Sequence, residues 1–227
     1  MTTDEFEQQA RQIGDRILVL PDDQRIAAAC RGSANPAALA WLGEALGLST
    51  ATSLVDLGAG MGGPLAWFRL RYDCAGIAME PSGAAASVAA TLFGLVVLRA
   101  SGESTPFRDG GFDTALMLGV VSVVDDALRS LREARRVGRR LGVLDYCSTG
   151  PSTVTAGGSH FPTPARLKNM LAATGWSIDQ AAPVAIDAPA TWRDAVDRLA
   201  VEPARAEREV VAAIESGAIA PFMVVAR

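Results

Sequence analysis

Lysine and histidine are nearly absent from this sequence, in which Lys168 is the one lysine and His160 the one histidine. A single imidazole excludes metal sites that need two histidines, including the zinc-protease helix pattern, and this rules out many hydrolases. Arginine supplies the rest of the positive charge, but the formal net charge is −4. The composition therefore gives no electrostatic reason to expect nucleic acid as a partner.

Cysteine is scarce too, and the three cysteines are Cys30, Cys74 and Cys147. Their wide separation, without any C-x-x-C spacing, argues against a disulfide framework or a zinc knuckle and favours a reducing compartment. The longest apolar runs, 92–98 and 115–124, are shorter than the roughly 20 residues that span a bilayer. Residues 1–9 are acidic where a secretory signal is basic and then apolar. We therefore expect a cytoplasmic protein without a metal site, a targeting segment or a membrane span.

The apolar content is sufficient for one core. Among 227 residues, 49% are hydrophobic and 20% charged, which indicates a single α/β domain. Residues 1–50 are predicted to form a helical cap within that domain. Residues 4–30 are predicted as helix, with an apolar stripe that ends at Pro21, and residues 36–46 as a second helix.

Beyond the cap, short apolar runs alternate with helical patterns. The predicted order is strand 54–57, helix 63–71, strand 75–79, helix 82–93, strand 95–98, strand 113–119, helix 125–137 and strand 141–146. Residues 148–163, rich in Gly, Ser, Thr and Pro, indicate a flexible connection. The remaining predictions are helix 164–173, mixed strand and loop 176–186, one or two helices in 190–216 and a closing strand 221–226. Because the strands are continuously apolar, we expect a largely parallel sheet with helices on both faces.

The stretch that organises the chain is 52–64, Thr-Ser-Leu-Val-Asp-Leu-Gly-Ala-Gly-Met-Gly-Gly-Pro. An apolar strand runs into Asp56, and a glycine-rich turn then leads into a helix. Residues without Cβ let backbone amides approach a ligand closely, so this strand, turn and helix predict the binding site. Glu80 follows the second strand, twenty residues after Gly60, where a carboxylate can accept hydrogen bonds from ribose hydroxyls. The pattern alone leaves NAD, FAD, a nucleotide and S-adenosylmethionine open.

A resemblance narrows this choice. Val-Asp-Leu-Gly-Ala-Gly-Met-Gly-Gly at 55–63, Met-Glu-Pro at 79–81 and Pro-Phe-Arg-Asp-Gly-Gly-Phe-Asp at 106–113 resemble class I S-adenosylmethionine-dependent methyltransferases, particularly the small-molecule group of ubiquinone and tocopherol type. The resemblance runs from about residue 54 to 145. It implies a doubly wound, Rossmann-like seven-stranded sheet with an antiparallel last strand, and a cofactor-binding methyltransferase domain over 51–227. The implied cofactor is S-adenosylmethionine.

The same resemblance assigns a set of residues to the cofactor. They are Asp56 at the turn or the amino group, Gly58, Ala59 and Gly60 under the methionine part, Glu80 at the ribose, Pro81 against adenine, Ser101 and Gly102 at the adenine edge, and Leu118 with its carbonyl toward the amino group. Where the family often has aspartate this chain has Ser101, a weaker acceptor for the adenine amino group.

Two residues after the central strands are candidates for the chemistry. His160 lies after the fifth strand, and imidazole is the side chain that ordinarily titrates near neutral pH, so it is a candidate to contact or deprotonate the acceptor. Tyr146 ends the fifth strand beside Asp145 and is a candidate to bind the acceptor. A histidine that only packs or faces water, and a structural tyrosine, remain the alternatives.

We predict O- or N-methylation of a small-molecule acceptor, with a homodimer left open. The arginines of 129–140 are interpreted as the solvated face of a helix rather than as an RNA-binding surface. One rival is an NAD(P)-dependent oxidoreductase, although the Tyr-x-x-x-Lys pair is missing because Pro164 precedes Lys168 by four residues. The other rival is a non-catalytic module that retains the cofactor fold.

Overall fold

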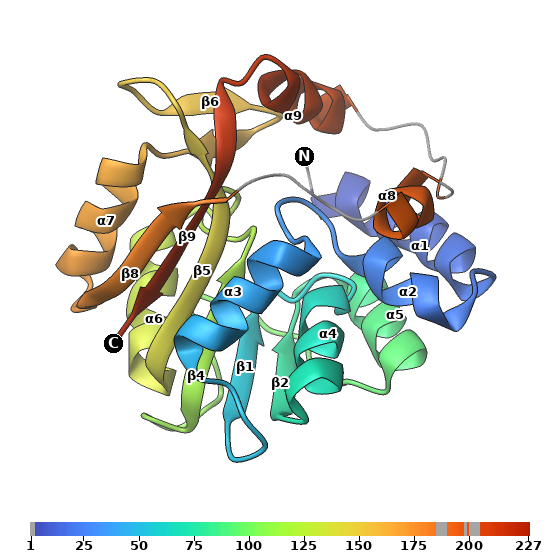
Figure 1. The fold of residues 1–227 in the computed structure, drawn as a ribbon, viewed down its shortest axis with the longest axis horizontal. Coiled ribbons are helices and arrows are strands. Elements are labelled where there is room, and N and C mark those ends of the chain that lie inside the picture. The colour runs from blue at the N-terminus through green and yellow to red at the C-terminus, as the bar shows by residue number, and fades with distance from the viewer. Residues whose placement is uncertain (1–2, 185–189, 198, 200–204) are drawn as a thin grey trace.

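The computed structural model describes residues 3–184, 190–197, 199 and 205–227 (Figure 1). Within these residues the main sheet has seven strands in the order β3-β2-β1-β4-β5-β9-β8. Their bounds are β3 (Val96–Leu98), β2 (Ala75–Met79), β1 (Ser53–Leu57), β4 (Phe112–Leu118), β5 (Gly138–Ser148), β9 (Ile219–Ala226) and β8 (Ile178–Pro183). The first five are parallel, and β9 runs antiparallel to both β5 and β8. This confirms the predicted doubly wound, Rossmann-like fold.

Helices cover both faces of the sheet and build two cores. One face carries α3 (Pro36–Leu46), α4 (Gly63–Tyr72) and α5 (Gly83–Phe93), and the other carries α6 (Ala127–Val137) and α7 (Pro164–Ala173) (Figure 1). Leu39 and Phe68 are fully buried in the first core, and Leu131 and Leu167 in the second. The strands between them are buried on both sides, which explains their continuously apolar sequences.

The N-terminal cap consists of α1 (Thr3–Leu18) and α2 (Asp22–Ala29), followed by α3. The prediction of helix throughout 4–30 is wrong, because Pro21 has an extended backbone (φ −54°, ψ 145°) and separates the two helices. The boundaries of α3 follow local rules: the Asn35 side chain accepts the N–H of Ala38, and Gly47 ends the helix with φ +66°. The cap packs through α1 on α5 and through α2 on α4 and α8 (Ala190–Asp197).

The prediction of a flexible connection over 148–163 is also wrong. This segment contains a hairpin of β6 (Val154–Ala156) and β7 (Ser159–Phe161), with Gly157 and Gly158 at its turn. Both glycines have positive φ, +57° and +79°, as a tight two-residue hairpin turn requires. The hairpin packs on α9 (Arg205–Glu215), and the two lie together at one end of the molecule (Figure 1).

Other predictions agree with the structure or fall outside it. The helix predicted at 164–173 has the bounds of α7, and the predicted helices in 190–216 correspond to α8 and α9. Positions 185–186, 198 and 200–204, which also carried predictions, lie outside the described residues. In the part of the chain that the structure describes, none of the helices is both long and apolar enough to cross a membrane.

Candidate functional site

The glycine turn lies at the carboxyl edge of the sheet, between β1 and α4. The amides of Gly58 and Ala59 both donate to the carbonyl of Met79, at the end of β2 (2.8 and 2.9 Å). β1 has β2 on one side and β4 on the other. The strands that follow β1 in the chain are therefore added first on one side of it and then on the other, and the order of the strands reverses at β1. Open α/β sheets bind ligands at such a switch point.

Asp56 lies beneath this turn as a buried carboxylate without a partner. It is 1% exposed, and neither Oδ1 nor Oδ2 accepts a hydrogen bond within the described structure. Burial, and secondarily the charge of Glu80, raise its pKa to about 7. A buried carboxylate is costly unless a cation or hydrogen-bond donors compensate it, so this site favours a ligand with a positively charged or N–H group.

Glu80 directly follows β2 and is 4% exposed. Its Oε2 accepts the N–H of Gly60 and its Oε1 accepts the N–H of Ser82, both at 2.8 Å. Burial raises the pKa of Glu80, and the two amides act in the opposite direction. Each carboxylate oxygen has a further lone pair, so the group can also accept hydrogen bonds from ligand hydroxyls.

The glycines of the turn serve different purposes. At Gly62 and Gly63 an added Cβ would come within 2.8 Å of Ala89 and 2.6 Å of Cys30, so these glycines permit close packing on α5 and on the cap. Gly60 has φ +55°, and a Cβ there would meet nothing within 4 Å. Gly60 therefore borders open space beside Glu80, where a ligand can lie against bare backbone.

The other predicted cofactor residues lie around this centre. Pro81 and Ser101 are exposed, and Gly102 is half-buried, where an added Cβ would lie 4.0 Å from Leu57 at the end of β1. The Ser101 hydroxyl accepts the N–H of Glu103 at 3.2 Å. Leu118 is half-buried at the end of β4. The sequence analysis missed the next residue: Gly119 has φ +73°, and a Cβ there would meet nothing within 4 Å.

The acceptor candidates lie near the carboxyl end of β5. Tyr146 does not end this strand as predicted, because β5 continues to Ser148, and His160 lies farther along the chain on β7. Tyr146 is 8% exposed, its ring packs edge-on against Phe161, and its hydroxyl donates to the Gly32 carbonyl of the cap at 3.4 Å. Its pKa is raised by burial and then by the charge of Asp145. His160 is exposed on β7, and its Nδ1 lies 3.1 Å from Thr155 Oγ1. Nε2 is therefore the ring nitrogen that can face an acceptor.

A buried pair next to these residues was not predicted. Asp145, 1% exposed, accepts the hydroxyl of Ser122 at 2.6 Å and the N–H of Ser122 at 3.1 Å. The sequence placed Asp145 near the end of a strand but gave no indication of its partner. Nothing in the sequence around Ser122 distinguishes this serine from an ordinary loop serine.

Comparison with known proteins identifies the domain that contains this site. Residues 55–144, which hold Asp56, Glu80, Ser101 and Leu118, match the methyltransferase domain family. The chain therefore carries a methyltransferase domain over these residues. No curated protein matches its sequence.

Solved structures share the fold of this protein. Geranyl diphosphate C-methyltransferase from Streptomyces coelicolor A3(2), bound to Mg²⁺, geranyl-S-thiolodiphosphate and S-adenosyl-L-homocysteine, is 15% identical (TM-score 0.67, covering 84% of this chain and 74% of that one). The [4+2]-cyclase SpnF is 20% identical (TM-score 0.70, covering 96% of both chains). A methyltransferase in complex with the Haloferax volcanii Trm112 activator is 16% identical (TM-score 0.66, covering 98% and 96%). At these identities the likeness establishes the fold alone.

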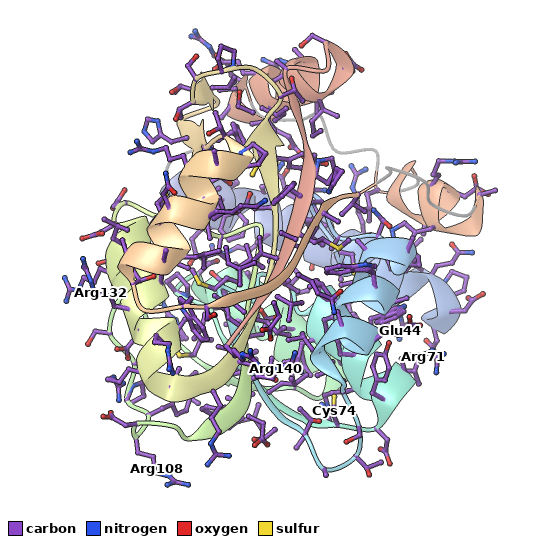
Figure 2. All side chains as sticks on the ribbon, turned by 60° about the vertical axis from the view of Figure 1, so that its left-hand side comes forward. Glu44, Arg71, Cys74, Arg108, Arg132 and Arg140 are labelled. Carbon is purple, nitrogen blue, oxygen red and sulfur yellow. The ribbon has the colours of Figure 1, made fainter. Side chains whose placement is uncertain are left out.

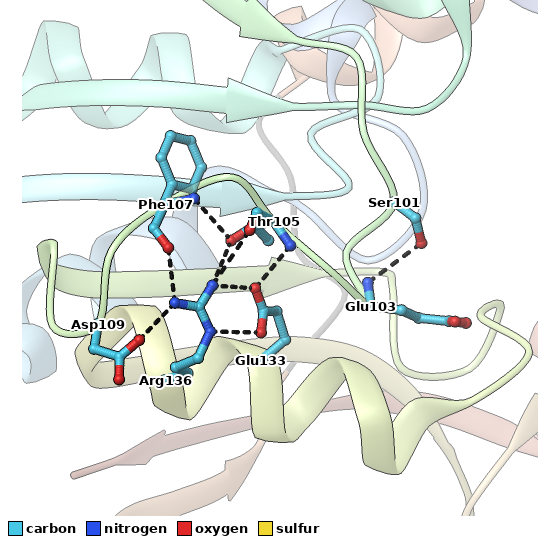
Figure 3. Close-up of polar contacts among 7 residues, drawn as sticks. All are labelled: Ser101, Glu103, Thr105, Phe107, Asp109, Glu133 and Arg136. Atoms are coloured by element: carbon cyan, nitrogen blue, oxygen red, sulfur yellow. Dashed lines mark hydrogen bonds and ion pairs between the residues drawn. The ribbon is translucent and has the colours of Figure 1, made fainter.

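Arg136 of α6 holds the segment that carries Ser101 and Gly102. Its guanidinium donates to both oxygens of Glu133, to Asp109 and to the carbonyls of Thr105 and Phe107 (Figure 3). The interpretation of the arginines in 129–140 as a solvated face is therefore wrong for Arg136. Arg140 also lies inward, donating to the Leu46 and Ala45 carbonyls, whereas Arg132 and Arg108 project from the surface (Figure 2).

We expect Arg136→Ala to lower the free energy of unfolding at pH 7 by about 3 kcal/mol, because it removes the cation beside the largely buried Glu133 and leaves that carboxylate the Thr105 N–H as a donor. The hydrogen bond from Arg136 is the main reason why the pKa of Glu133 is lowered to about 2. A lowered pKa stabilises the fold above about pH 4.5, and this contribution is lost as the pH falls toward 2. Urea unfolding at pH 7 and pH 3 measures both effects. The control is Arg139→Ala, which removes an exposed pair with Asp113 and should cost less than about 1 kcal/mol; equal losses in the two variants would contradict the prediction.

The cap is joined to α9 by polar and charged side chains. Glu207 of α9 accepts hydrogen bonds from Gln9 of α1 and from the Arg31 guanidinium after α2. Together with the bond from Tyr146 to Gly32, these contacts join the cap to α9 and to β5. Among the described residues no group of three or more His, Cys, Asp or Glu side chains is placed to hold a metal ion.

Proposed function

We propose that this methyltransferase transfers a methyl group from S-adenosylmethionine to an oxygen or nitrogen atom of a small organic molecule. The observation that carries the proposal is the pair of buried carboxylates, Asp56 and Glu80, beside the open face of Gly60. S-adenosylmethionine offers an ammonium group and two ribose hydroxyls, and these are the groups that an unpartnered carboxylate and a second carboxylate with free lone pairs can bind. The residues therefore fit this cofactor.

The sulfonium of the bound cofactor supplies the methyl group, which moves by in-line displacement. The protein must then align the acceptor and exclude water. The cap and α9 can help to exclude water, because the ion pair between Arg31 and Glu207 holds them together. In our proposal Tyr146 lines the acceptor side and His160 takes the proton that an oxygen or nitrogen acceptor loses. We also propose the ubiquinone and tocopherol type of small-molecule subgroup, action in the cytoplasm, and a homodimer that light scattering would detect.

Calorimetry tests the cofactor. S-adenosylhomocysteine is expected to bind and NADH is not; the opposite preference would support the oxidoreductase rival and overturn the proposal. Methyl-labelled S-adenosylmethionine, incubated with the protein and a low-molecular-mass metabolite extract, is then expected to give a labelled product whose mass identifies the acceptor. Label found only in RNA or protein added in parallel would contradict a small-molecule acceptor.

We expect His160→Ala to lower formation of that labelled product by about 10²-fold or more, because removal of a general base has effects of this size. The affinity for S-adenosylhomocysteine should not change, since His160 lies on β7 and is not among the residues that we assign to the cofactor. The matched control is Thr153→Ala, an exposed position just before β6 of the same hairpin, which should keep full turnover. Unchanged turnover in His160→Ala would remove this residue from the mechanism.

A second candidate is a protein that binds the cofactor but does not transfer its methyl group. The specific support is SpnF, whose name describes a cyclase, and which aligns with 96% of this chain. Tight binding of S-adenosylmethionine with no labelled product from any extract would favour this candidate.

A further inference from the structure

The segment that follows β4 lies across the end of β5. Leu118, the last residue of β4, is in register with Leu144 of β5. Asp145 is therefore the first residue of β5 that extends past the end of β4. The chain turns at Gly119, whose N–H donates to the Leu144 carbonyl at 2.7 Å, and returns as 120–124 beside Asp145. Two segments of the carboxyl edge thus meet at this carboxylate.

Asp145 joins these segments through three neutral donors. Its Oδ1 accepts the Ser122 hydroxyl at 2.6 Å and the N–H of Tyr146 at 2.8 Å, and its Oδ2 accepts the N–H of Ser122 at 3.1 Å. Ser122 is itself only 3% exposed. An ionised carboxylate accepts at both oxygens, whereas an asparagine would replace one acceptor by a donor that faces another donor. A carboxylate is therefore specifically required here.

The same serine holds the hairpin. The carbonyl of Ser122 accepts the N–H of His160 at 2.7 Å, the midpoint of β7. A second bond, from the Ser148 amide to the Pro162 carbonyl at 2.9 Å, joins the end of β5 to the residue after β7. The link from Asp145 through Ser122 to His160 is continuous and lies entirely at the carboxyl edge.

We propose that Asp145 and Ser122 are positioning residues for the acceptor side of the site: Asp145 fixes Ser122, and the Ser122 carbonyl holds His160 in place. The assignment of His160 to the acceptor rests on the proposed function; the link itself does not. Neither residue is assigned contact with the acceptor or with the cofactor.

Protonation of Asp145 should weaken the link from Asp145 through Ser122 to His160. Burial raises its pKa to about 6, against the lowering effect of the bonds from Ser122 and Tyr146. The other titratable groups in contact with its charge, Tyr146 and Cys147, also have raised pKa values, chiefly because they are buried. Below pH 6 the charge-assisted bonds become neutral and weaken.

Amide hydrogen exchange of the protein without cofactor tests the proposal. Ser122→Ala should speed exchange at the His160 amide about tenfold or more, and Ser122→Thr, which keeps a hydroxyl, should restore most of the protection. The matched control is Ser130→Ala: Ser130 is 0% exposed and its hydroxyl has no partner in the described structure, so the same truncation should leave His160 unchanged. The NMR signals of the imidazole are unambiguous because His160 is the one histidine, and they should shift in Ser122→Ala alone.

The wild-type protein provides a test that needs no variant. After correction for intrinsic exchange, protection of the His160 amide should fall below about pH 6, while the Ser177 amide, bonded to the Arg227 carbonyl at 2.8 Å, keeps its protection. Equal exchange at His160 in the Ser122→Ala and Ser130→Ala proteins, or parallel pH profiles for the two amides, would overturn the proposal. Binding of S-adenosylhomocysteine is measured separately and should be the same in all variants, so loss of this link and failure of the proposed function are distinguishable.

Discussion

Gly60→Ala is expected to weaken binding of S-adenosylhomocysteine about tenfold to a hundredfold. A Cβ at this position meets no protein atom within 4 Å, so it enters the space that borders Glu80 and that we assign to the cofactor. Overpacking of this kind costs about 1–3 kcal/mol, and each 1.4 kcal/mol is about tenfold in affinity. Isothermal calorimetry measures the change.

Gly94→Ala is the matched control for this experiment. Gly94 follows α5 with φ +59°, close to the +55° of Gly60, and a Cβ there also meets nothing within 4 Å. Each variant should therefore lose a similar stability, about 1 kcal/mol, from placing alanine in the left-handed region. Only Gly60→Ala should lose affinity. If both variants bind equally well, the cofactor does not lie against Gly60.

Asp56→Asn is expected to stabilise the protein without cofactor and to weaken cofactor binding. The pKa of Asp56 rises from 3.8 to about 7 on folding, so between these pH values the native state binds more protons than the unfolded state. Stability is therefore lost as the pH rises through this window, by an amount that corresponds to about 4 kcal/mol. The asparagine variant does not pay this cost, although its amide is also buried without a partner.

The measurement is the difference in unfolding free energy between Asp56→Asn and wild type, in urea, from pH 4 to pH 8. The difference should grow with pH and level off above about pH 7, in favour of the variant. Asp113→Asn is a useful comparison, because hydrogen bonds from Ser53 lower the pKa of that carboxyl and the sign of the pH dependence is reversed. A constant difference across the range would mean that Asp56 is compensated in the folded protein.

The elements of the sheet could be predicted because their signals are local. β1 and β2 are short apolar runs ended by a glycine turn or a proline, and α7 begins after the capping residue Thr163 with Pro164 in its first turn. The hairpin 154–161 could not be predicted from composition, because its three-residue strands are stable only through packing on Tyr146 and α9. The Gly157-Gly158 pair was a usable signal, since two adjacent residues with positive φ are typical of a tight hairpin turn.

The candidate site also has a part that the sequence predicts and a part that it does not. Asp56, Gly60 and Glu80 lie at the ends of neighbouring strands, so the order of the strands brings them together. The bonds of Ser122 to Asp145 and of Arg31 to Glu207 join segments that are distant in sequence and meet only in the folded chain. The interpretation of Arg136 was wrong for a related reason: helical periodicity shows which face of a helix an arginine lies on, but not that an earlier loop of the chain packs around it.

The position of β9 has a consequence for how the protein folds. It is the last strand in chain order, yet it lies inside the sheet, where Asp145 pairs with Phe222 and β8 pairs on the other side. Until β9 is in place, β5 and β8 each present an unpaired edge to other chains, and such edges are templates for aggregation. Pairing between segments so far apart in sequence is also slow to form. Low temperature and low protein concentration should therefore improve the yield of refolding, and substitutions in β9 should reduce recovery of folded protein before they change its affinity for ligand.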